Sequence, residues 1–264
     1  MAGRPRYHAG DRSRDVLELD SRTILIDNAR SWSRSPALER EGFALFAHRS
    51  EVADFGDPRE ISRTHIPEIE HLLLEQTGAD EIVVSPTAVR RTTPCSAGSS
   101  RIKRSGSLYE TRPVCFVHID IDDTTASALA ERRRPRAGGR CVWRFAHYNI
   151  WRALTPPPQD LPLALCDSRS VSPTDLVEAD AIMDLPGMPE SSYVGLLVRH
   201  NPRHSWSHFP DMNRDEVIVF KTHDSERDHP SHVPHAAFSD PTCPAAAEPR
   251  ASIEMRAIAY WFRS

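Results

Sequence analysis

The sequence has little glycine and no long apolar run, and both shortages narrow what the chain can be. Its 264 residues include only 11 glycines against 22 prolines, which indicates stiff connections between structural elements rather than flexible linkers. No stretch approaches the roughly 20 consecutive apolar residues that a membrane-spanning helix needs. The sequence therefore predicts a protein that has a sizeable core and does not associate with a membrane.

Cysteine is also scarce. The five cysteines are odd in number, widely spaced and form no CxxC pair. This usage is typical of a reducing compartment and argues against a disulfide framework or a structural zinc site. No apolar segment follows the basic residues near the N-terminus, so no signal peptide is indicated. We therefore expect a cytoplasmic protein.

The charge balance excludes one class of partner. The chain has 33 Lys and Arg residues against 37 Asp and Glu residues, a formal net charge of -4. A nucleic-acid-binding protein needs a basic patch, which this balance does not support. We expect small molecules as partners rather than nucleic acid. The sequence does not fix the oligomeric state, and a homodimer stays open.

Strand-like segments outnumber helical ones and lie mostly after residue 80. They are joined by proline-rich turns rather than by regular crossover helices, which argues against a doubly wound sheet. We predict a mainly β fold with peripheral helices, of the double-stranded β-helix (jelly-roll, cupin-like) type. Residues 1–15 are expected to be a flexible leader. Residues 16–264 are expected to be a single jelly-roll domain with N-terminal helices and strands added.

One run, "VCFVHIDIDD" at 114–123, places a histidine and acidic residues inside an otherwise apolar segment. A strand over 113–122 would put His118 and Asp120 on the same face, because side chains alternate along a strand. Burying such groups without partners is costly. The pair is therefore either a hydrogen-bonded core pair or two ligands of a metal ion. Two histidines and one carboxylate form the facial triad of non-haem Fe(II) oxygenases.

A third ligand has to come from the remaining histidines, which gather in "RHNPRHSWSHF" and "THDSERDHPSHVPHAAF". His235 is the preferred candidate, because it follows a proline and enters a small-apolar stretch that can approach a buried site. The alternative is a hydrogen-bonded loop histidine.

A 2-oxoglutarate-dependent enzyme also needs a cation for the far carboxylate of that cosubstrate, and arginine suits this role. Arg256 lies inside the final apolar strand, where an unpaired guanidinium would be costly. It is the preferred anchor, with a structural pair to Glu254 as the alternative interpretation. Arg250 is the second candidate anchor, but it follows Pro249 and is expected in a more exposed loop.

Several longer stretches carry a resemblance to a known family. They are "LEREGFALFAH", "RPVCFVHID", "YNIWRAL", "PLALCDSRSV", "DMNRDEVIVFKTHDS", "VPHAAFSDP" and "RASIEMRAIAYW". From about residue 37 onward the chain resembles the hydroxylase/desaturase family of non-haem Fe(II)/2-oxoglutarate oxygenases. That family includes the cephamycin 7-hydroxylation component, aspergillic-acid-type hydroxylases and a gibberellin desaturase.

The resemblance implies an oxidoreductase that uses Fe(II), 2-oxoglutarate and dioxygen. Its expected reaction is hydroxylation, desaturation or oxidative cyclisation at an unactivated C–H bond of a small, carboxylate-bearing secondary metabolite or amino acid. It implies His118, Asp120 and His235 as metal ligands, and no catalytic residue beyond the metal site is indicated.

The resemblance also implies further site residues. Arg256, Arg152 and Lys221 are expected to face the cosubstrate or a substrate carboxylate. The residues themselves suggest Asn149, Trp151, Trp206 and His223 as candidates for the substrate pocket. Core packing is the alternative for Asn149 and Trp151, and an aromatic core is the preferred interpretation of Trp206. His223 departs from the family pattern, in which an aromatic residue commonly precedes the aspartate.

Two other hypotheses stay open. In the first, the protein is a cosubstrate-independent non-haem iron oxygenase, whose substrate itself chelates the metal. In the second, it is a non-catalytic partner of a biosynthetic methyltransferase, because one family member is known chiefly alongside such an enzyme.

Overall fold

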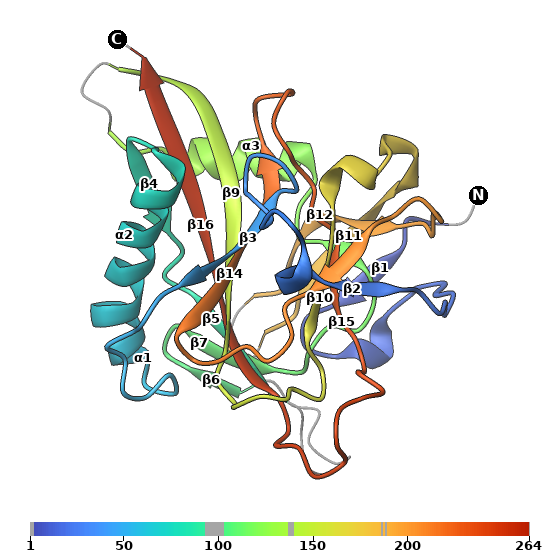
Figure 1. The fold of residues 1–264 in the computed structure, drawn as a ribbon. Helices are drawn as coiled ribbons and strands as arrows, with labels where there is room; N and C mark the ends of the chain where they lie inside the picture. The colour runs from blue at the N-terminus through green and yellow to red at the C-terminus, as the bar shows by residue number, and fades with distance from the viewer. Residues whose placement is uncertain (1–2, 93–102, 137–139, 186, 188, 264) are drawn as a thin grey trace.

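The computed structural model describes residues 3–92, 103–136, 140–185, 187 and 189–263, so that Cys95 lies outside the described part. Within these residues the chain folds into two eight-stranded sheets that face each other (Figure 1). The prediction of a mainly β fold with peripheral helices is confirmed.

The first sheet brings together strands from both ends and the middle of the chain. In spatial order it contains β1 (Arg6–His8), β11 (Leu176–Met183), β12 (Ser191–Val198), β8 (His118–Ile119), β15 (His235–Ala237), β10 (Leu163–Cys166), β13 (Trp206–His208) and β2 (Ile26–Asn28). Two N-terminal strands thus form its two edges.

The second sheet contains the longest strands. Its order is β3 (Phe43–Ala47), β14 (Glu216–Asp224), β9 (Cys141–Ala153), β16 (Ala251–Arg263), β5 (Ala88–Thr92), β7 (Leu108–Thr111) and β6 (Lys103–Ser105), and β4 (Glu81–Val84) also pairs with β16. The central strands β9 and β16 run antiparallel along most of their lengths.

One helical segment covers the outer face of the second sheet (Figure 1). It runs through α1 (Pro58–Glu60), a π-helical turn (Ile61–His65) and α2 (Ile66–Thr77). Gly78 ends α2 in the left-handed conformation at φ 64°, which favours glycine, and its N–H bonds the Leu74 carbonyl.

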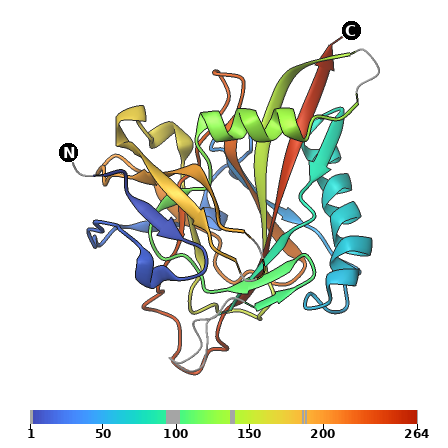
Figure 2. The same ribbon diagram turned by 180° about the vertical axis from the view of Figure 1, so that it is seen from behind.

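A second helix, α3 (Asp123–Arg132), crosses the end of the strands (Figure 2). Asp122 caps it by accepting a hydrogen bond from the Thr125 N–H at 2.8 Å. Short 3₁₀ turns occupy 12–14, 29–31, 168–170 and 173–175. None of the helices in the described part of the chain combines the length and apolar character needed to cross a bilayer.

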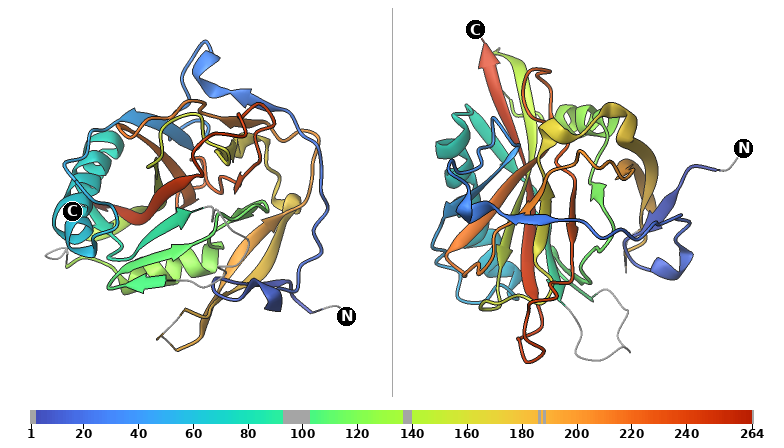
Figure 3. Two further views of the ribbon diagram at one scale, coloured as in Figure 1. Left: turned by 90° about the horizontal axis from the view of Figure 1, so that it is seen from below. Right: turned by 45° about the vertical axis from the view of Figure 1, so that its right-hand side comes forward.

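The N-terminal segment differs from the expected flexible leader over 1–15. Strand β1 pairs in parallel with β11, and the Arg6 N–H and carbonyl both bond to Val16. From β1 the chain runs along the outside of the first sheet to its other edge (Figure 3). The edge of β11 offers unpaired backbone groups, which explains why a polar segment is ordered there.

The strand expected over 113–122 is also much shorter than predicted. Only His118 and Ile119 form β8, because this segment pairs with β12 at two residues and with β15 at one. The flanking residues therefore lie in irregular structure.

Two apolar layers hold the fold together. The inner layer lies between the sheets and includes Phe43, Trp151 and Phe220, whereas the outer layer packs Ile69 and Leu73 of α2 against the second sheet. Fully burying each such side chain contributes about 1.5–3 kcal/mol.

A buried charge network joins β14, β9 and the segment before β3. Lys221 is completely buried, and its Nζ bonds Asp224 at 2.8 Å and Glu39 at 3.0 Å. Arg144 Nη2 donates to the same two carboxylates. These pairs supply the counter-charges that two buried cations require.

We expect Asp224→Ala to destabilise the protein by about 3–5 kcal/mol, because it leaves Lys221 and Arg144 buried without their shared carboxylate. Urea unfolding followed by circular dichroism would measure the loss. Glu39→Ala is the control: its carboxylate is 45% exposed, so its removal should cost clearly less. Equal losses for both variants would contradict this account.

Candidate metal centre

The two predicted histidines and the predicted aspartate meet between the sheets. His118 on β8 lies directly opposite His235 on β15, and Asp120 follows β8. The Nε2 atoms of both histidines lie 3.6 Å from Asp120 Oδ1. All three residues are buried, and their ligand atoms lie within 4.8 Å of one another.

Both imidazole rings are held by backbone carbonyls. His118 Nδ1 donates to the Phe116 carbonyl at 3.0 Å, and His235 Nδ1 donates to the Val233 carbonyl at 3.1 Å. Because a carbonyl only accepts, Nδ1 carries the proton and each Nε2 presents a lone pair toward Asp120. Burial and the neighbouring His235 lower the pKa of His118 to about 3, so its ring is neutral at pH 7.

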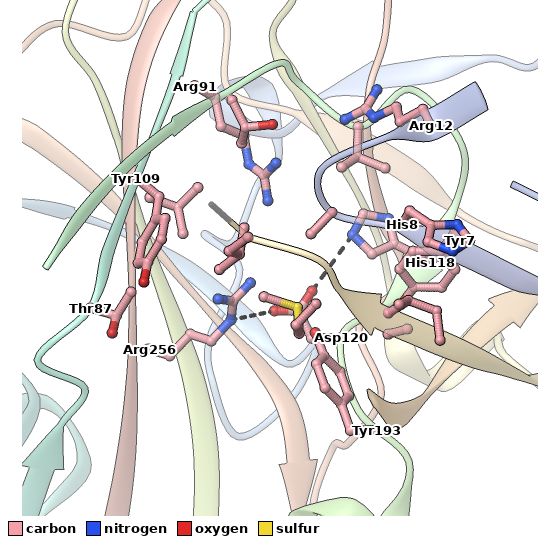
Figure 4. A pocket seen from close by; sticks show the side chains of 18 of the residues that line it. Tyr7, His8, Arg12, Thr87, Arg91, Tyr109, His118, Asp120, Tyr193 and Arg256 are labelled. Atoms are coloured by element: carbon pink, nitrogen blue, oxygen red, sulfur yellow. Dashed lines mark hydrogen bonds and ion pairs between the residues drawn. The ribbon is translucent and has the colours of Figure 1, made fainter. Parts of the chain in front are cut away.

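The two oxygens of Asp120 have different surroundings. Oδ2 accepts hydrogen bonds from Arg256 Nε at 2.7 Å and from Asn149 Nδ2 at 3.0 Å, whereas Oδ1 faces the two histidines. Figure 4 shows Asp120 between Arg256 and His118. Arg256 also donates to Glu254 at 2.9 Å. Burial opposes ionisation of Asp120, but the guanidinium of Arg256 holds its pKa well below the usual value.

This donor set fits a divalent iron ion. Two neutral imidazole nitrogens and one ionised carboxylate oxygen converge on one point. The second polar atom of each side chain makes a hydrogen bond that orients it: Nδ1 of each histidine donates one, and Oδ2 of Asp120 accepts one. Three protein ligands leave further coordination positions for small molecules.

A cavity of about 120 Å³ opens beside the centre. His118, Asp120 and Arg256 form one wall, and Arg12 and Arg91 lie across from them in Figure 4. The remaining lining is largely apolar. Burial raises the pKa of Tyr7 and of Tyr193, so both phenols in this lining stay protonated.

Arg250 is buried rather than exposed in a loop as predicted. It has 2% relative exposure, and it donates to the Leu161 carbonyl at 2.6 Å and to Ser252 Oγ at 3.2 Å. Its guanidinium lies 5.0 Å from the centroid of the Trp151 ring. Within the described part of the chain, none of the ion pairs involves Arg250. Pro249 therefore leads Arg250 into the core.

Three further buried polar atoms near this region lack a hydrogen-bond partner among the described residues: Trp151 Nε1, Asn149 Oδ1 and Ser207 Oγ. Asn149 and Trp151 share a face of β9, because they lie two residues apart. Ser207 is opposite Leu165, which in turn is opposite His235. Unsatisfied buried groups of this kind indicate an absent ligand or water.

Of the predicted cofactor and pocket residues, Arg256 and Asn149 bond Asp120 at the centre, and Trp151 packs in the inner apolar layer beside Arg250. Two other predicted cations lie away from the centre. Arg152 points to the opposite face of β9, where it donates to the carbonyls of His48 and Arg214. Lys221 belongs to the buried network with Glu39 and Asp224. Both side chains are therefore already bonded to other groups of the chain.

Trp206 and His223 also lie away from the cavity. Trp206 packs with Ala164 and Cys166, on the face of the first sheet opposite to Ser207. His223 contacts Asp123 near the start of α3. Neither residue lines the cavity beside the centre.

Three cavity residues, Tyr7, Arg12 and Arg91, were absent from the sequence-based prediction. Arg91 follows Val89 by two residues in β5, so alternation along a strand could have placed both on one face. Tyr7 and Arg12 carried no such signal, because their polar segment has no hydrophobic periodicity.

We expect Arg256→Ala and Asn149→Ala each to weaken Fe(II) binding about 10–100-fold, the usual effect of removing a group that orients a metal ligand. Anaerobic calorimetric titration of the metal-free protein with Fe(II) would measure this. Arg263→Ala, at the exposed end of the same strand as Arg256, should leave the affinity unchanged. Wild-type affinity in Arg256→Ala and Asn149→Ala would show that Asp120 needs neither partner to bind the metal.

Comparisons with known proteins agree with this geometry. The family model described as "Oxidoreductase/YMDC permease-like domain" matches residues 4–260. The hydroxylase/desaturase CTB9 of Cercospora beticola is 27% identical over 92% of this chain and 77% of its own length. The alpha-ketoglutarate-dependent dioxygenase tstK of Talaromyces stipitatus is 26% identical over 89% of this chain and 83% of its own length.

A solved structure shows the same fold. The iron and alpha-ketoglutarate-dependent endoperoxidase NvfI superimposes with a TM-score of 0.79 at 22% identity, over 98% of this chain and 92% of its own. This likeness confirms the predicted jelly roll.

Proposed function

Because the chain belongs to the family described as the oxidoreductase/YMDC permease-like domain, we propose that it is an Fe(II)- and 2-oxoglutarate-dependent dioxygenase. Relatives named as dioxygenases of this kind support the proposal. The observation that carries it is the buried triad of His118, Asp120 and His235, whose two imidazoles and carboxylate face one point.

Bound Fe(II) would supply the oxidising chemistry that removes hydrogen from a C–H bond of a substrate, with 2-oxoglutarate as the reductant for dioxygen. His118 and His235 would hold the metal through Nε2, and Asp120 would hold it through Oδ1. Arg256 and Asn149 keep Asp120 Oδ2 occupied and so aim Oδ1 at the metal. Burial of the triad keeps bulk water from the reacting atoms.

A complete and oriented triad favours an enzyme over a non-catalytic partner. Burying Asp120 requires the hydrogen bonds from Arg256 and Asn149, and a scaffold protein would gain nothing from this arrangement. The relatives named hydroxylase/desaturase make a carbon centre the expected point of oxidation.

Arg250 is the best-supported anchor for the far carboxylate of 2-oxoglutarate. Burial, together with Arg91, lowers the pKa of Arg250 to about 9, and none of the ion pairs of the described residues compensates its charge. Ser252 Oγ and the unpartnered Trp151 Nε1 lie close to its guanidinium. An incoming carboxylate would satisfy this buried cation.

Arg256, the anchor expected from the sequence, already has two carboxylate partners. Its Nε bonds Asp120 and its Nη2 bonds Glu254. The charge of Arg256 is therefore already compensated by two carboxylates, which makes it a weaker attractor of a third than Arg250 is. We therefore assign Arg256 to orienting Asp120 and Arg250 to the cosubstrate.

Anaerobic titration of the protein with Fe(II) and then 2-oxoglutarate tests both assignments. We expect a visible metal-to-ligand charge-transfer band in the wild type and none in His235→Ala. Arg250→Ala should need at least about 30-fold more 2-oxoglutarate, as expected for truncating one partner of a buried charge pair. Arg263→Ala serves as the surface control.

The alternatives give different results. A 2-oxoglutarate requirement raised only in Arg256→Ala would return the anchor to that residue. Bound iron without a band would favour a cosubstrate-independent oxygenase. Failure to bind iron would contradict the proposed function.

We infer that the substrate is a small molecule with an apolar body and a carboxylate. Arg12 and Arg91 face the cavity opposite the metal ligands. Among the described residues, Arg12 bonds the backbone carbonyls of Arg112 and Pro113 and no carboxylate. Val89 and Phe116 line the space between with apolar surface. The cations would hold the carboxylate while the hydrocarbon part lies near the metal.

Comparing small acids with their primary amides tests this substrate class. We expect Arg12→Gln to raise the KM of an accepted acid about 10-fold or more while changing that of its amide little, because one charged hydrogen bond is lost. Arg4→Gln on the exposed surface is the control, and its kinetics should match the wild type. Equal KM changes for the acid and its amide would contradict a carboxylate at Arg12.

A further inference from the structure

A second group of two histidines and one aspartate lies outside the cavity. Asp123 is the first residue of α3, His223 is the penultimate residue of β14, and His232 lies in the loop before β15. His223 Nδ1 and His232 Nε2 each lie 3.0 Å from Asp123 Oδ1. One ligand atom from each residue falls within 4.8 Å of the others. We call these three residues the second cluster.

Hydrogen bonding explains only part of this arrangement. His223 and Asp123 form a normal hydrogen bond. His232 Nε2 is buried and has no hydrogen-bond partner among the described residues, although it lies 3.0 Å from the carboxylate oxygen. Its direction therefore does not suit an N–H donor to that oxygen. A nitrogen held beside a carboxylate without a hydrogen bond suits a ligand of a shared cation.

The charges around the second cluster are compatible with a cation. In the described part of the chain, the ion pairs of Asp123 involve only His223 and His232. A third group, Glu39, Asp224 and His229, has similar geometry. Lys221 and Arg144 already neutralise the carboxylates of that third group. A metal ion in the third group would have to displace Lys221 and Arg144. No Lys or Arg side chain of the described residues pairs with Asp123 in the second cluster.

His223 is also held in place before any ion binds. Its ring stacks on Phe145 with centroids 5.4 Å apart and an interplanar angle of 26°, and His147 packs edge-on at 6.0 Å. Burial lowers the pKa of His223, so its ring is neutral at pH 7 and a bound cation would take the place of the Nδ1 proton. Asp123 is 72% exposed, which leaves water access for the remaining coordination positions.

We propose that Asp123, His223 and His232 bind a second divalent transition-metal ion of the zinc class, separate from the iron centre. Two imidazoles and a carboxylate, completed by water, are a ligand set that Zn²⁺ accepts. None of the three residues lines the cavity beside the iron centre.

The position of the second cluster gives this ion a structural role. Asp123 lies three residues after Asp120, and His232 lies three residues before His235. An ion between them would fasten together the two chain segments that carry ligands of the iron centre. It would also tie both segments to β14 through His223. We therefore expect metal binding here to stabilise the fold.

Counting bound zinc in a two-by-two set of variants tests the proposal. After chelation and dialysis, ZnCl₂ is titrated into the wild type, into His118→Ala/His235→Ala, into His232→Ala and into the triple variant. We expect two, one, one and no equivalents, respectively. His229→Ala is the matched control, because His229 lies in the same loop but bonds Glu39, and it should bind two.

A second measurement does not depend on counting ions. Zn²⁺ should raise the melting temperature of His118→Ala/His235→Ala, and this increase should disappear when His232→Ala is added. If His118→Ala/His235→Ala does not fold, the number of zinc ions bound by the wild type, by His232→Ala and by Asp123→Asn still tests the proposal. One equivalent in the wild type, or two in both His232→Ala and Asp123→Asn, would overturn the proposal. Both results are independent of 2-oxoglutarate and so leave the proposed function to its own test.

Discussion

The buried carboxylate of Asp120 is the group on which the centre depends. Its two oxygens are used differently: Oδ2 accepts from Arg256 and Asn149, and Oδ1 faces the imidazoles of His118 and His235. Arg256 and Asn149 come from adjacent strands of the second sheet, while the imidazoles come from the first. A single ionised group thus lies between the two sheets, and it stays ionised because Arg256 and Asn149 of the second sheet donate to it.

Four cations in the interior or at the cavity fall into two kinds, according to whether carboxylates of the chain contact them. Lys221 and Arg256 each contact two carboxylates of the chain, so their charges are compensated within the fold. Arg250 and Arg12 bond backbone carbonyls and, for Arg250, a serine hydroxyl. A guanidinium kept away from water without a carboxylate is costly, and a carboxylate ligand can offset that cost. This contrast supports the proposals that the cosubstrate binds at Arg250 and a substrate carboxylate at Arg12. Arg152 is also buried without a carboxylate, but it lies on the opposite face of β9, away from the centre.

Much of the metal centre could be predicted from the sequence because its signals are local. Alternation along a strand places His118 beside Asp120, and the proline before His235 marks an entry into apolar sequence. The predictions that placed Arg152 and Lys221 at the centre were wrong, because the directions of these side chains do not follow from the sequence. Asn149 faces the centre, so its third neighbour Arg152 faces away from it on β9. The register shift between Lys221 and His223 breaks the alternation there, and no sequence pattern predicts such an irregularity.

The sequence by itself determined the mainly β architecture, the two histidines and the aspartate of the centre, and the need for buried cations near it. Each of these follows from the composition or periodicity of a short segment. Only the tertiary structure decided which carboxylate each cation meets, that the N-terminal strand forms part of the cavity, and that Asp123, His223 and His232 converge. These outcomes depend on pairing between strands distant in sequence, where interaction energies are set by positions in space rather than by spacing along the chain.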